Sequence, residues 1–465
     1  MSCATGGARD CRQIDSFLPE RRLHSIRQER QLLNIDLERR KIALFGNFGR
    51  GNFGNESTLH AMLYHLRRLA PDAEFSCICT GPETVATTFG ITAVPSRTAV
   101  VKHWAIHNPL ARLARKLLVG IPSELYRWLK CVRMLWGTDV LIVPGTGLLT
   151  DACGFFDWGP YDMFRWSVAA KLCRCKLFFV SVGAGPIYSR LGRFFIKAPL
   201  SLADFRSYRD ESTLQYLKGV GFQAAGDPVY PDLVFSLPES LIPRSHHGEG
   251  RRLVIGLGLM LYVWKYSVER PTGTIYTAYL ETLVEFVKWL VAHEYNVRLL
   301  IGDLGDTEVV REFRSLLKER SVNDEGDRII DEPACSFKDL LSQLAATDLV
   351  VATRFHNVLL ALLLNKPVLA VSFHHKCSSL MSHMGLSEYC QDINCLQADR
   401  LIEQFCRLEQ NAVSLKRMIR EKVTAYRSAL DEQYGVICSG ICPDRRQVAP
   451  PATEIQPNPK SSVLS

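Results

Sequence analysis

Residues 348–373 read DLVVATRFHNVLLALLLNKPVLAVSF. The first part, 348–353, and the last part, 367–373, have the length and the Val-rich composition of buried strands. Between them, 358–364 is an apolar helical segment that cannot continue past Pro367. A strand, a helix and a second strand in this order predict a parallel sheet that is covered on both faces.

The rest of the chain repeats this alternation of short apolar runs and amphipathic stretches. A polar segment with Pro and Gly, residues 238–252, separates the runs into two sets. We therefore expect two doubly wound, Rossmann-like α/β domains that face a cleft. The expected strands are 41–45, 74–80, 139–144, 176–183, 204–209 and 232–235 in the first set, and 252–259, 296–302, 328–332, 348–353 and 367–373 in the second.

The two ends of the chain differ from this central part in composition. The beginning is rich in charge and short of apolar periodicity, whereas the tail is rich in Pro and Ser. The expected organisation is an N-terminal extension at 1–40, a first α/β domain at 41–240, a linker at 241–252, a second α/β domain at 253–435 and a disordered tail at 436–465.

The composition argues against several classes of protein. The 465 residues carry a net charge of +8, but no Lys/Arg block is long enough to suggest a nucleic-acid partner. The 15 cysteines include no C-x-x-C pair, so we expect buried thiols in a reducing cytosol and no metal site. No apolar signal region and no run of about 20 apolar residues occurs, which predicts a cytoplasmic protein.

The segment at 49–58, GRGNFGNEST, fits the G-x-G-x-x-G spacing of a dinucleotide-binding turn. A NAD-binding fold also needs an acidic residue at the end of its second strand, and here that strand ends at Thr80. The sequence therefore disfavours NAD. A loop whose backbone approaches another ligand, beside the helix that begins near Ser57, and a tight turn without a ligand both remain open.

Charged residues follow several of the expected strands. Arg209, Arg354 and Lys376 come after strands of both sets, and His356 stands between a strand end and the apolar helix. Ligands of open α/β sheets bind beyond the carboxyl ends of the strands, so these side chains are expected at one cleft. Arginine suits carboxylate or phosphate, and histidine suits general acid catalysis near neutral pH. Taken singly, such an Arg is more often a surface ion pair and such a His a structural residue.

Together, the motifs at the strand ends resemble the polysaccharide pyruvyl transferase family. The resemblance spans residues 41–395, and its most specific part is the Arg-x-His segment followed by a Ser-x-x-x-Lys loop. The motifs that carry it are GNFGNEST, PGTGLLTD, SVGAGP, RSYRDEST, GDPVYPDLVF, ATRFHNVLLALLLNKPVLAVSFHHK and MGL.

The resemblance implies a fold similar to the two-domain GT-B glycosyltransferases. It also implies transfer of a pyruvyl group from phosphoenolpyruvate to a pair of sugar hydroxyls, with a cyclic ketal and phosphate as products. The expected acceptors are cell-surface glycans and exopolysaccharides, often as lipid-linked precursors, bound on the side of the first domain. The donor is expected on the side of the second domain, and no metal or redox cofactor is expected.

Matched by position, Arg354 and His356 correspond to the family's Arg-x-His element, which contacts phosphoenolpyruvate, and Arg209 and Lys376 correspond to further donor-binding cations. The candidate acceptor-side and loop residues are Gly51, Asn52, Gly54, Asn55, Glu56, Gly145, Gly147 and Asp151. The chain departs from the family at Asn55, where Asp is usual, and at PGTG, which replaces the more usual GGG.

The chemistry of pyruvyl transfer assigns provisional roles to these residues. An acid is needed near the methylene carbon of the donor, and His356 is the candidate. A base for the acceptor hydroxyl is sought among Glu56, Asp151 and Asp157, between which the sequence does not choose. The alternatives are a nucleotide-sugar-dependent glycosyltransferase of the same architecture and a non-catalytic glycan-binding member of the family. The former usually needs a ribose-binding carboxylate late in the second domain, and none follows Lys376 before Glu388.

Residues 108–136 are basic and amphipathic, with Glu124 as their acidic residue and Trp128 and Trp136 towards their end. The basic residues are Arg112, Arg115, Lys116, Arg127, Lys130 and Arg133. Two helices packed on the sheet explain this pattern, as most amphipathic helices serve a core. The alternative is a peripheral contact with the inner face of a membrane.

Overall fold

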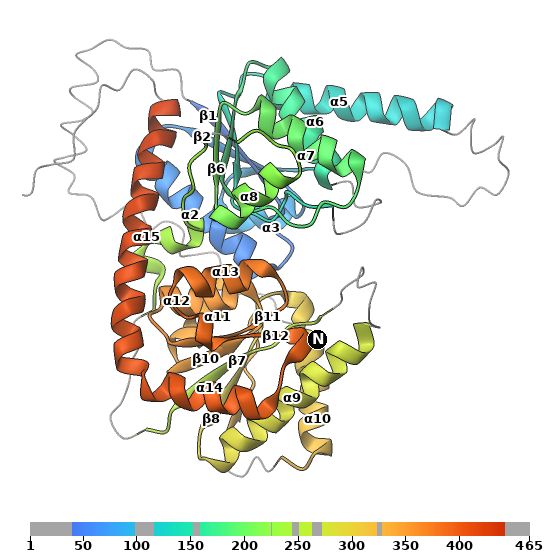
Figure 1. Ribbon diagram of the computed structural model, residues 1–465. Helices are drawn as coiled ribbons and strands as arrows, with labels where there is room; N and C mark the ends of the chain where they lie inside the picture. The colour runs from blue at the N-terminus through green and yellow to red at the C-terminus, as the bar shows by residue number, and fades with distance from the viewer. Residues whose placement is uncertain are drawn as a thin grey trace, which may run out of the picture. The chain divides into compact units, whose positions relative to one another are not determined.

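The computed structural model (Figure 1) describes residues 40–97, 116–151, 159–224, 226–243, 251–262, 272–322 and 328–441. These residues form two parallel six-stranded sheets, with the strand orders β3-β2-β1-β4-β5-β6 and β12-β11-β10-β7-β8-β9. This arrangement confirms the expected pair of doubly wound sheets. The strands are β1 (Lys41–Gly46), β2 (Glu74–Cys79), β3 (Thr92–Pro95), β4 (Val140–Pro144), β5 (Lys176–Val182), β6 (Phe205–Tyr208), β7 (Val254–Gly258), β8 (Asn296–Leu300), β9 (Ile329–Ile330), β10 (Leu349–Ala352), β11 (Val368–Ser372) and β12 (Cys390–Asp392).

Helices alternate with these strands along the chain. Several of them begin at a polar side chain that accepts a hydrogen bond from the first turn, such as Asn52, Ser189, Asp210 and Ser336. The main helices are α2 (Phe53–Leu69), α3 (Pro82–Phe89), α5 (Ile121–Leu135), α6 (Gly159–Leu172), α7 (Arg190–Leu202), α8 (Glu211–Gly219), α9 (Thr272–Ala292), α10 (Thr307–Glu319), α11 (Phe337–Ala345), α12 (Phe355–Leu363), α13 (His375–His383), α14 (Ala398–Gln410) and α15 (Ala412–Ile441).

The order of the strands reverses between β1 and β4 in the first sheet and between β7 and β10 in the second. At such a point the loops that leave neighbouring strands turn to opposite faces and open a crevice, where ligands bind. The glycine loop follows β1, the PGTG segment follows β4, and Arg354 and His356 follow β10. The topology therefore brings these segments to the crevices of their sheets.

Helix α12 is apolar on all sides from Val358 onwards, and its residues from Asn357 to Leu363 are buried. One part of its surface contacts β10 and β11, and another contacts α2 and the short 3-10 helix η3 (Leu233–Ser236), which belong to the first half of the chain. A helix covered in this way needs no polar face. The core accordingly runs without interruption from one sheet to the other.

The structure corrects two details of the expected elements. Residues 232–235 were expected to form a strand, but Asp232 accepts a hydrogen bond from Val234 N and starts η3 instead. The short strands β3 and β12, at sheet edges, were not expected. Edge strands bury less of their length, so their sequences lack the long apolar runs of the central strands.

Helix α15 extends beyond residue 435, the expected end of the second domain, and so corrects the expected start of the tail at 436. Ile437 and Ile441 continue its buried face, and Lys176 Nζ on β5 donates to Gly440 O at 2.7 Å. Gln433, which is fully buried, donates to Ser207 Oγ at 2.6 Å and to Ser181 Oγ at 3.0 Å. The helix that follows the second sheet therefore packs on the first. Residues 244–250 of the expected linker and residues 442–465 of the expected tail lie outside the described residues.

We predict that Gln433→Ala lowers the free energy of unfolding by about 2–3 kcal/mol, because it leaves buried hydroxyls of Ser181 and Ser207 without their amide partner. Chemical denaturation monitored by circular dichroism measures the change. The matched control is Val436→Ala on the exposed side of the same helix, with an expected effect of about 0.5 kcal/mol or less. Equal effects of the two substitutions would contradict a role for the buried network.

Candidate active site

The glycine loop after β1 pairs with the loop after β8. Leu304 N donates to Gly51 O at 2.9 Å, Phe53 N donates to Gly302 O at 3.1 Å, and Asn52 Nδ2 donates to Asp303 Oδ2 at 2.8 Å. Gly51 has a φ of +79°, and a Cβ at this position would overlap the side chain of Leu304. The loop is therefore a tight turn that joins the two halves of the chain, and it leads directly into α2.

Gly54, in the first turn of α2, packs against His356, in the first turn of α12. A Cβ on Gly54 would overlap the imidazole ring at Nδ1, so the absence of a side chain makes room for the histidine. The other ring nitrogen, Nε2, is buried and has no hydrogen-bond partner among the described residues. An unpaired buried nitrogen is costly, and a bound ligand is one way to satisfy it.

Arg209 follows β6 and is 7% exposed. Its Nη1 lies 3.2 Å from Asp232 Oδ2, and its guanidinium carbon lies 4.7 Å from the centre of the Phe355 ring. Nη2 is buried without a hydrogen-bond partner among the described residues, next to Gly183, where a Cβ would overlap it. Part of the guanidinium is thus fixed by the protein, and part remains available to an anion.

Lys376 lies in the first turn of α13, and a Cβ on Gly147 would lie 3.4 Å from its Nζ. Gly147 belongs to the PGTG segment after β4, so this contact brings the lysine of the second half to a loop of the first. In the same segment, Gly145 packs closely on the backbone oxygen of Ser181. Burial, and then the positive charge of Arg209, lower the pKa of Lys376 to about 7.

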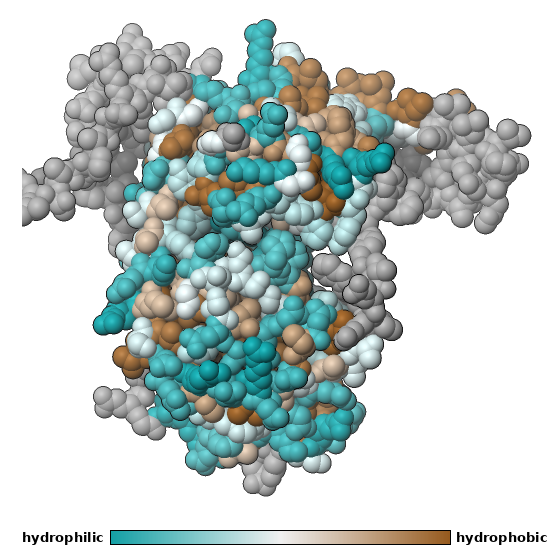
Figure 2. All heavy atoms as spheres, viewed as in Figure 1, coloured by the Kyte–Doolittle hydropathy of each residue, from teal (hydrophilic) through white to brown (hydrophobic). Residues whose placement is uncertain are grey.

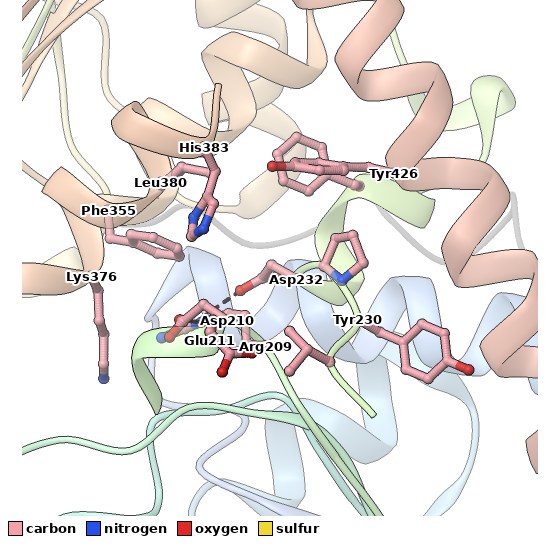
Figure 3. Close-up of a pocket in the computed structure, with 13 residues that line it drawn as sticks. Arg209, Asp210, Glu211, Tyr230, Asp232, Phe355, Lys376, Leu380, His383 and Tyr426 are labelled. Atoms are coloured by element: carbon pink, nitrogen blue, oxygen red, sulfur yellow. Dashed lines mark hydrogen bonds and ion pairs between the residues drawn. The ribbon is translucent and has the colours of Figure 1, made fainter. Parts of the chain in front are cut away.

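Arg209, Lys376, Phe355 and Asp232 line one pocket with a volume of about 230 Å³. In Figure 3 the side chains of Phe355 and Lys376 reach it from α12 and α13, whereas Arg209 and Asp232 reach it from the first half of the chain, and Tyr426 comes from α15. The pocket also has an apolar part, lined by Val229, Pro231, Phe235 and Leu380. A small anion with an apolar portion fits this combination of charge and surface.

The electrostatic surroundings of His356 differ from the sequence expectation. Burial lowers the pKa of His356 to about 4; Asp232 acts against this shift, while Arg209, Lys376 and Arg354 add to it. The imidazole is therefore neutral at pH 7 in the unliganded protein, rather than a ready acid. Negative charge bound beside it would reverse the effect of the surrounding cations.

Arg354 caps α12, but its guanidinium faces Asp306. Nε and Nη2 donate to the two carboxylate oxygens at 2.8 and 2.6 Å, and Asp306 is fully buried. Sequence reasoning overlooked Asp306 and Asp232 as partners of the two arginines. The signal for Asp306 was present, because it lies in the DLGD segment at a strand end.

Two of the candidate bases, Asp151 and Glu56, accept hydrogen bonds from nearby groups. Asp151 accepts from Tyr188 N at 2.7 Å, from Ser189 N at 2.9 Å and from Ser189 Oγ at 2.7 Å. Glu56 accepts from Gly49 N at 2.6 Å, and burial raises its pKa above the usual value.

Asn55, the position that departs from the family, donates through Nδ2 to Asn47 O at 2.9 Å and so closes the glycine loop. Asp157 lies outside the described residues. Among the residues that the structure describes, no group of His, Cys, Asp and Glu side chains is arranged to hold a metal ion.

We predict that Gly54→Ala displaces His356 and lowers the free energy of unfolding by about 1–3 kcal/mol, the usual cost of an added methyl in a packed core. Thermal unfolding measures the stability, and the affinity for inorganic phosphate measures the effect on the site. Gly219→Ala is the matched control, because a Cβ there meets open space. A Gly54→Ala protein as stable and as active in phosphate binding as this control would contradict the packing argument.

Comparisons with solved structures support the fold alone, because sequence identities are low. S. aureus MnaA bound to UDP matches with a TM-score of 0.54 and 12% identity, covering 86% of this chain and 97% of that one. A glycosyltransferase from Rickettsia africae matches with a TM-score of 0.51 and 13% identity, covering 88% and 100%. UDP-GlcNAc 2-epimerase from Neisseria meningitidis bound to UDP-GlcNAc matches with a TM-score of 0.51 and 12% identity, covering 86% and 100%. The fold is thus similar to GT-B-like enzymes.

Comparison with curated proteins finds no match. The family model described as polysaccharide pyruvyl transferase matches residues 52–375, which include most of the glycine loop as well as Arg209, Arg354 and His356. This range covers most of the chain. The chain belongs to the polysaccharide pyruvyl transferase family.

Proposed function

We propose that the protein transfers the pyruvyl group of phosphoenolpyruvate to two hydroxyls of a sugar in a polysaccharide or a lipid-linked glycan precursor. The observation that carries the proposal is the meeting of Arg209 and Lys376 at one small pocket, where a buried nitrogen of Arg209 is left unpaired. His356 lies close enough for the charges of both cations to lower its pKa, and its buried Nε2 is also unpaired. Membership of the family supports the same assignment.

The pocket suits the donor in charge and in size. Phosphoenolpyruvate carries a phosphate and a carboxylate, and fixed cations in a site with little water stabilise such charges strongly. The cavity of about 230 Å³ is smaller than the roughly 300–1,000 Å³ of sites for drug-sized ligands. Its size therefore favours a small anion over a complete nucleotide sugar, the donor of the competing glycosyltransferase hypothesis.

The reaction requires one proton on carbon and two new C–O bonds. A proton adds to the methylene carbon of phosphoenolpyruvate, and a sugar hydroxyl adds to C2, which becomes the ketal carbon. The C2–O bond to phosphate then breaks, and the second hydroxyl closes the ring. Of the two hydroxyl protons, one balances the proton on the new methyl group and the other leaves with phosphate.

His356 is the proposed acid for the methylene carbon. It is neutral in the free protein because burial and neighbouring cations disfavour its charged form. The negative charges of the donor would offset Arg209 and Lys376 and raise the pKa of the imidazole, so that a proton is taken up as the donor binds. His356 is thereby protonated mainly in the complex with the donor, where the reaction needs an acid.

A donor assay tests the proposal. The protein is incubated with an acceptor glycan and phosphoenolpyruvate, UDP-sugars or GDP-sugars, and phosphate release and the mass of the glycan are followed. We expect phosphate release only with phosphoenolpyruvate, together with a pyruvyl ketal on the glycan. Turnover with a nucleotide sugar instead would establish the glycosyltransferase alternative, and binding without turnover of any donor would favour a glycan-binding protein.

We predict that His356→Gln lowers kcat by about 10²–10⁴-fold and leaves the affinity for phosphoenolpyruvate within a few-fold of the wild type, because an acid acts mainly in the transition state. Calorimetric titration with phosphoenolpyruvate provides the affinity. His293→Gln, which changes an exposed histidine at the end of α9, is the control. A kcat that His356→Gln leaves unchanged would remove this residue from the chemistry.

We predict that the affinity of the protein for phosphoenolpyruvate falls as the pH rises through about 7, because Lys376 then loses its positive charge. Lys376→Arg keeps the charge at all these pH values and is expected to flatten the dependence between pH 6 and 9, which brackets that pKa. Titrations of both proteins at a series of pH values measure this. The same pH dependence in the two proteins would show that another group is responsible.

A further inference from the structure

Large apolar side chains are exposed along α5 and the short helical segment before it, η2 (Lys116–Gly120). Leu118, Ile121, Leu125, Leu129 and Trp136 are each more than half exposed. They recur at intervals of about one helical turn or two, so they share one side of the helix. We call them the α5 stripe. Arg112 and Arg115, which the sequence placed in the same amphipathic region, lie outside the described residues.

The neighbouring side of α5 accounts for the packing of this helix. Cys131 and Leu135 are buried, and the ring of Trp128 meets that of Phe164 on α6 at 6.2 Å. Trp128 and Glu124 also bind the hydroxyl of Tyr161 on α6. The core therefore uses one side of the helix, and the apolar residues of the α5 stripe are not needed for it.

Exposed apolar residues continue at α7. Leu191 and Phe194 on this helix and Tyr188 just before it are exposed, and Phe194 contacts Phe164, the ring that also meets Trp128, at 5.6 Å. Figure 2 shows apolar residues on the surface of the region where Figure 1 draws α5, α6 and α7. An exposed apolar surface of this extent usually marks an interaction site.

The same surface is rich in positive charge. Arg133 on α5 and Arg190 and Arg193 at the start of α7 are exposed, and residues 188–202 contain no acidic residue. The acidic residue of α5, Glu124, is bound by Arg127 at 2.8 Å and by Arg165 at 3.2 Å. Its negative charge is therefore already balanced.

The combination of charge and apolar side chains indicates which partner fits. A second copy of the chain bound through the same face would place these arginines against one another, which disfavours a symmetric dimer. An anionic lipid surface attracts the arginines and accepts the Leu and Trp side chains at the boundary of the headgroups. Among the described residues, no helix is long and apolar enough to cross a membrane.

We propose that the α5 stripe and the start of α7 bind the surface of a membrane that contains anionic lipids. The proposal goes beyond pyruvyl transfer, because it concerns a face formed by helices other than those that line the donor pocket. A peripheral contact of this kind would hold the protein where lipid-linked acceptors reside.

Sedimentation with vesicles tests the proposal on the full chain. Vesicles of phosphatidylcholine alone are compared with vesicles that also contain phosphatidylglycerol, at low and high salt. We expect binding to the anionic vesicles that weakens with salt, and much weaker binding to the neutral ones. Arg133→Gln/Arg193→Gln is expected to lower the partition coefficient on anionic vesicles by roughly 30-fold, and Leu125→Ser/Leu129→Ser to lower it on both kinds of vesicle.

Matched controls separate this face from general charge and hydrophobicity. Arg311→Gln/Lys318→Gln removes exposed positive charges from α10, and Val413→Ser/Val436→Ser removes exposed apolar side chains from α15. Both are expected to bind vesicles like the wild type, and circular dichroism checks that every variant is folded.

Three results would overturn the proposal. One is the absence of binding to anionic vesicles, and another is a loss of binding in the controls equal to that in the α5 and α7 variants. The third is a dimer, detected by light scattering, that Leu125→Ser/Leu129→Ser abolishes, because the stripe would then be a contact between copies. A protein that binds vesicles but does not turn over phosphoenolpyruvate would contradict the proposed pyruvyl transfer and leave the proposed membrane contact standing.

Discussion

The packing of Gly54 against His356 is the contact on which the site depends. It joins the first turn of α2, which follows β1, to the first turn of α12, which follows β10. Both strands lie where the strand order of their sheet reverses, so the contact joins the crevices of the two sheets. Directly before Gly54, the hydrogen bonds between the segments Gly51–Phe53 and Gly302–Leu304 also hold the two halves of the chain together. A ligand therefore meets residues of both halves in a geometry that is formed before it binds.

Helix α12 explains why this geometry is maintained. Its apolar residues contact its own sheet as well as α2 and η3, so separating the two halves would expose them to water. Phe355, at the start of the helix, lies under the guanidinium of Arg209. The same element therefore supplies the shared core, the catalytic candidate His356 and a surface for the cation that is proposed to bind the donor. Stability and function are coupled at this helix.

Most of the fold and part of the site could be predicted from sequence, for a physical reason. The central strands bury both faces and read as continuous apolar runs, and the parallel topology then brings Arg209, His356 and Lys376 to the strand ends. Which of these side chains are free for a ligand depends on tertiary contacts between residues far apart in the chain. Arg354 binds Asp306 and Arg209 binds Asp232, and neither pairing follows from local spacing. Likewise, residues 232–235 have a strand-like composition after Asp232, but Asp232 caps η3 and the apolar residues that follow it belong to this short helix, which α15 covers.

The charges of the pocket constrain the ligand further. Asp232 compensates part of the positive charge of Arg209, yet the pKa of Lys376 remains near 7 and that of His356 near 4. In the free site, burial and the repulsion between neighbouring cations therefore disfavour the protonated forms of Lys376 and His356. A neutral sugar would leave this repulsion in place. An anion with several negative charges offsets this repulsion and favours the protonated forms of Lys376 and His356. Part of its binding free energy would then come from reduced repulsion between the positive charges of the site. These charges therefore support the proposed function, in which the ligand is a small anion with several negative charges.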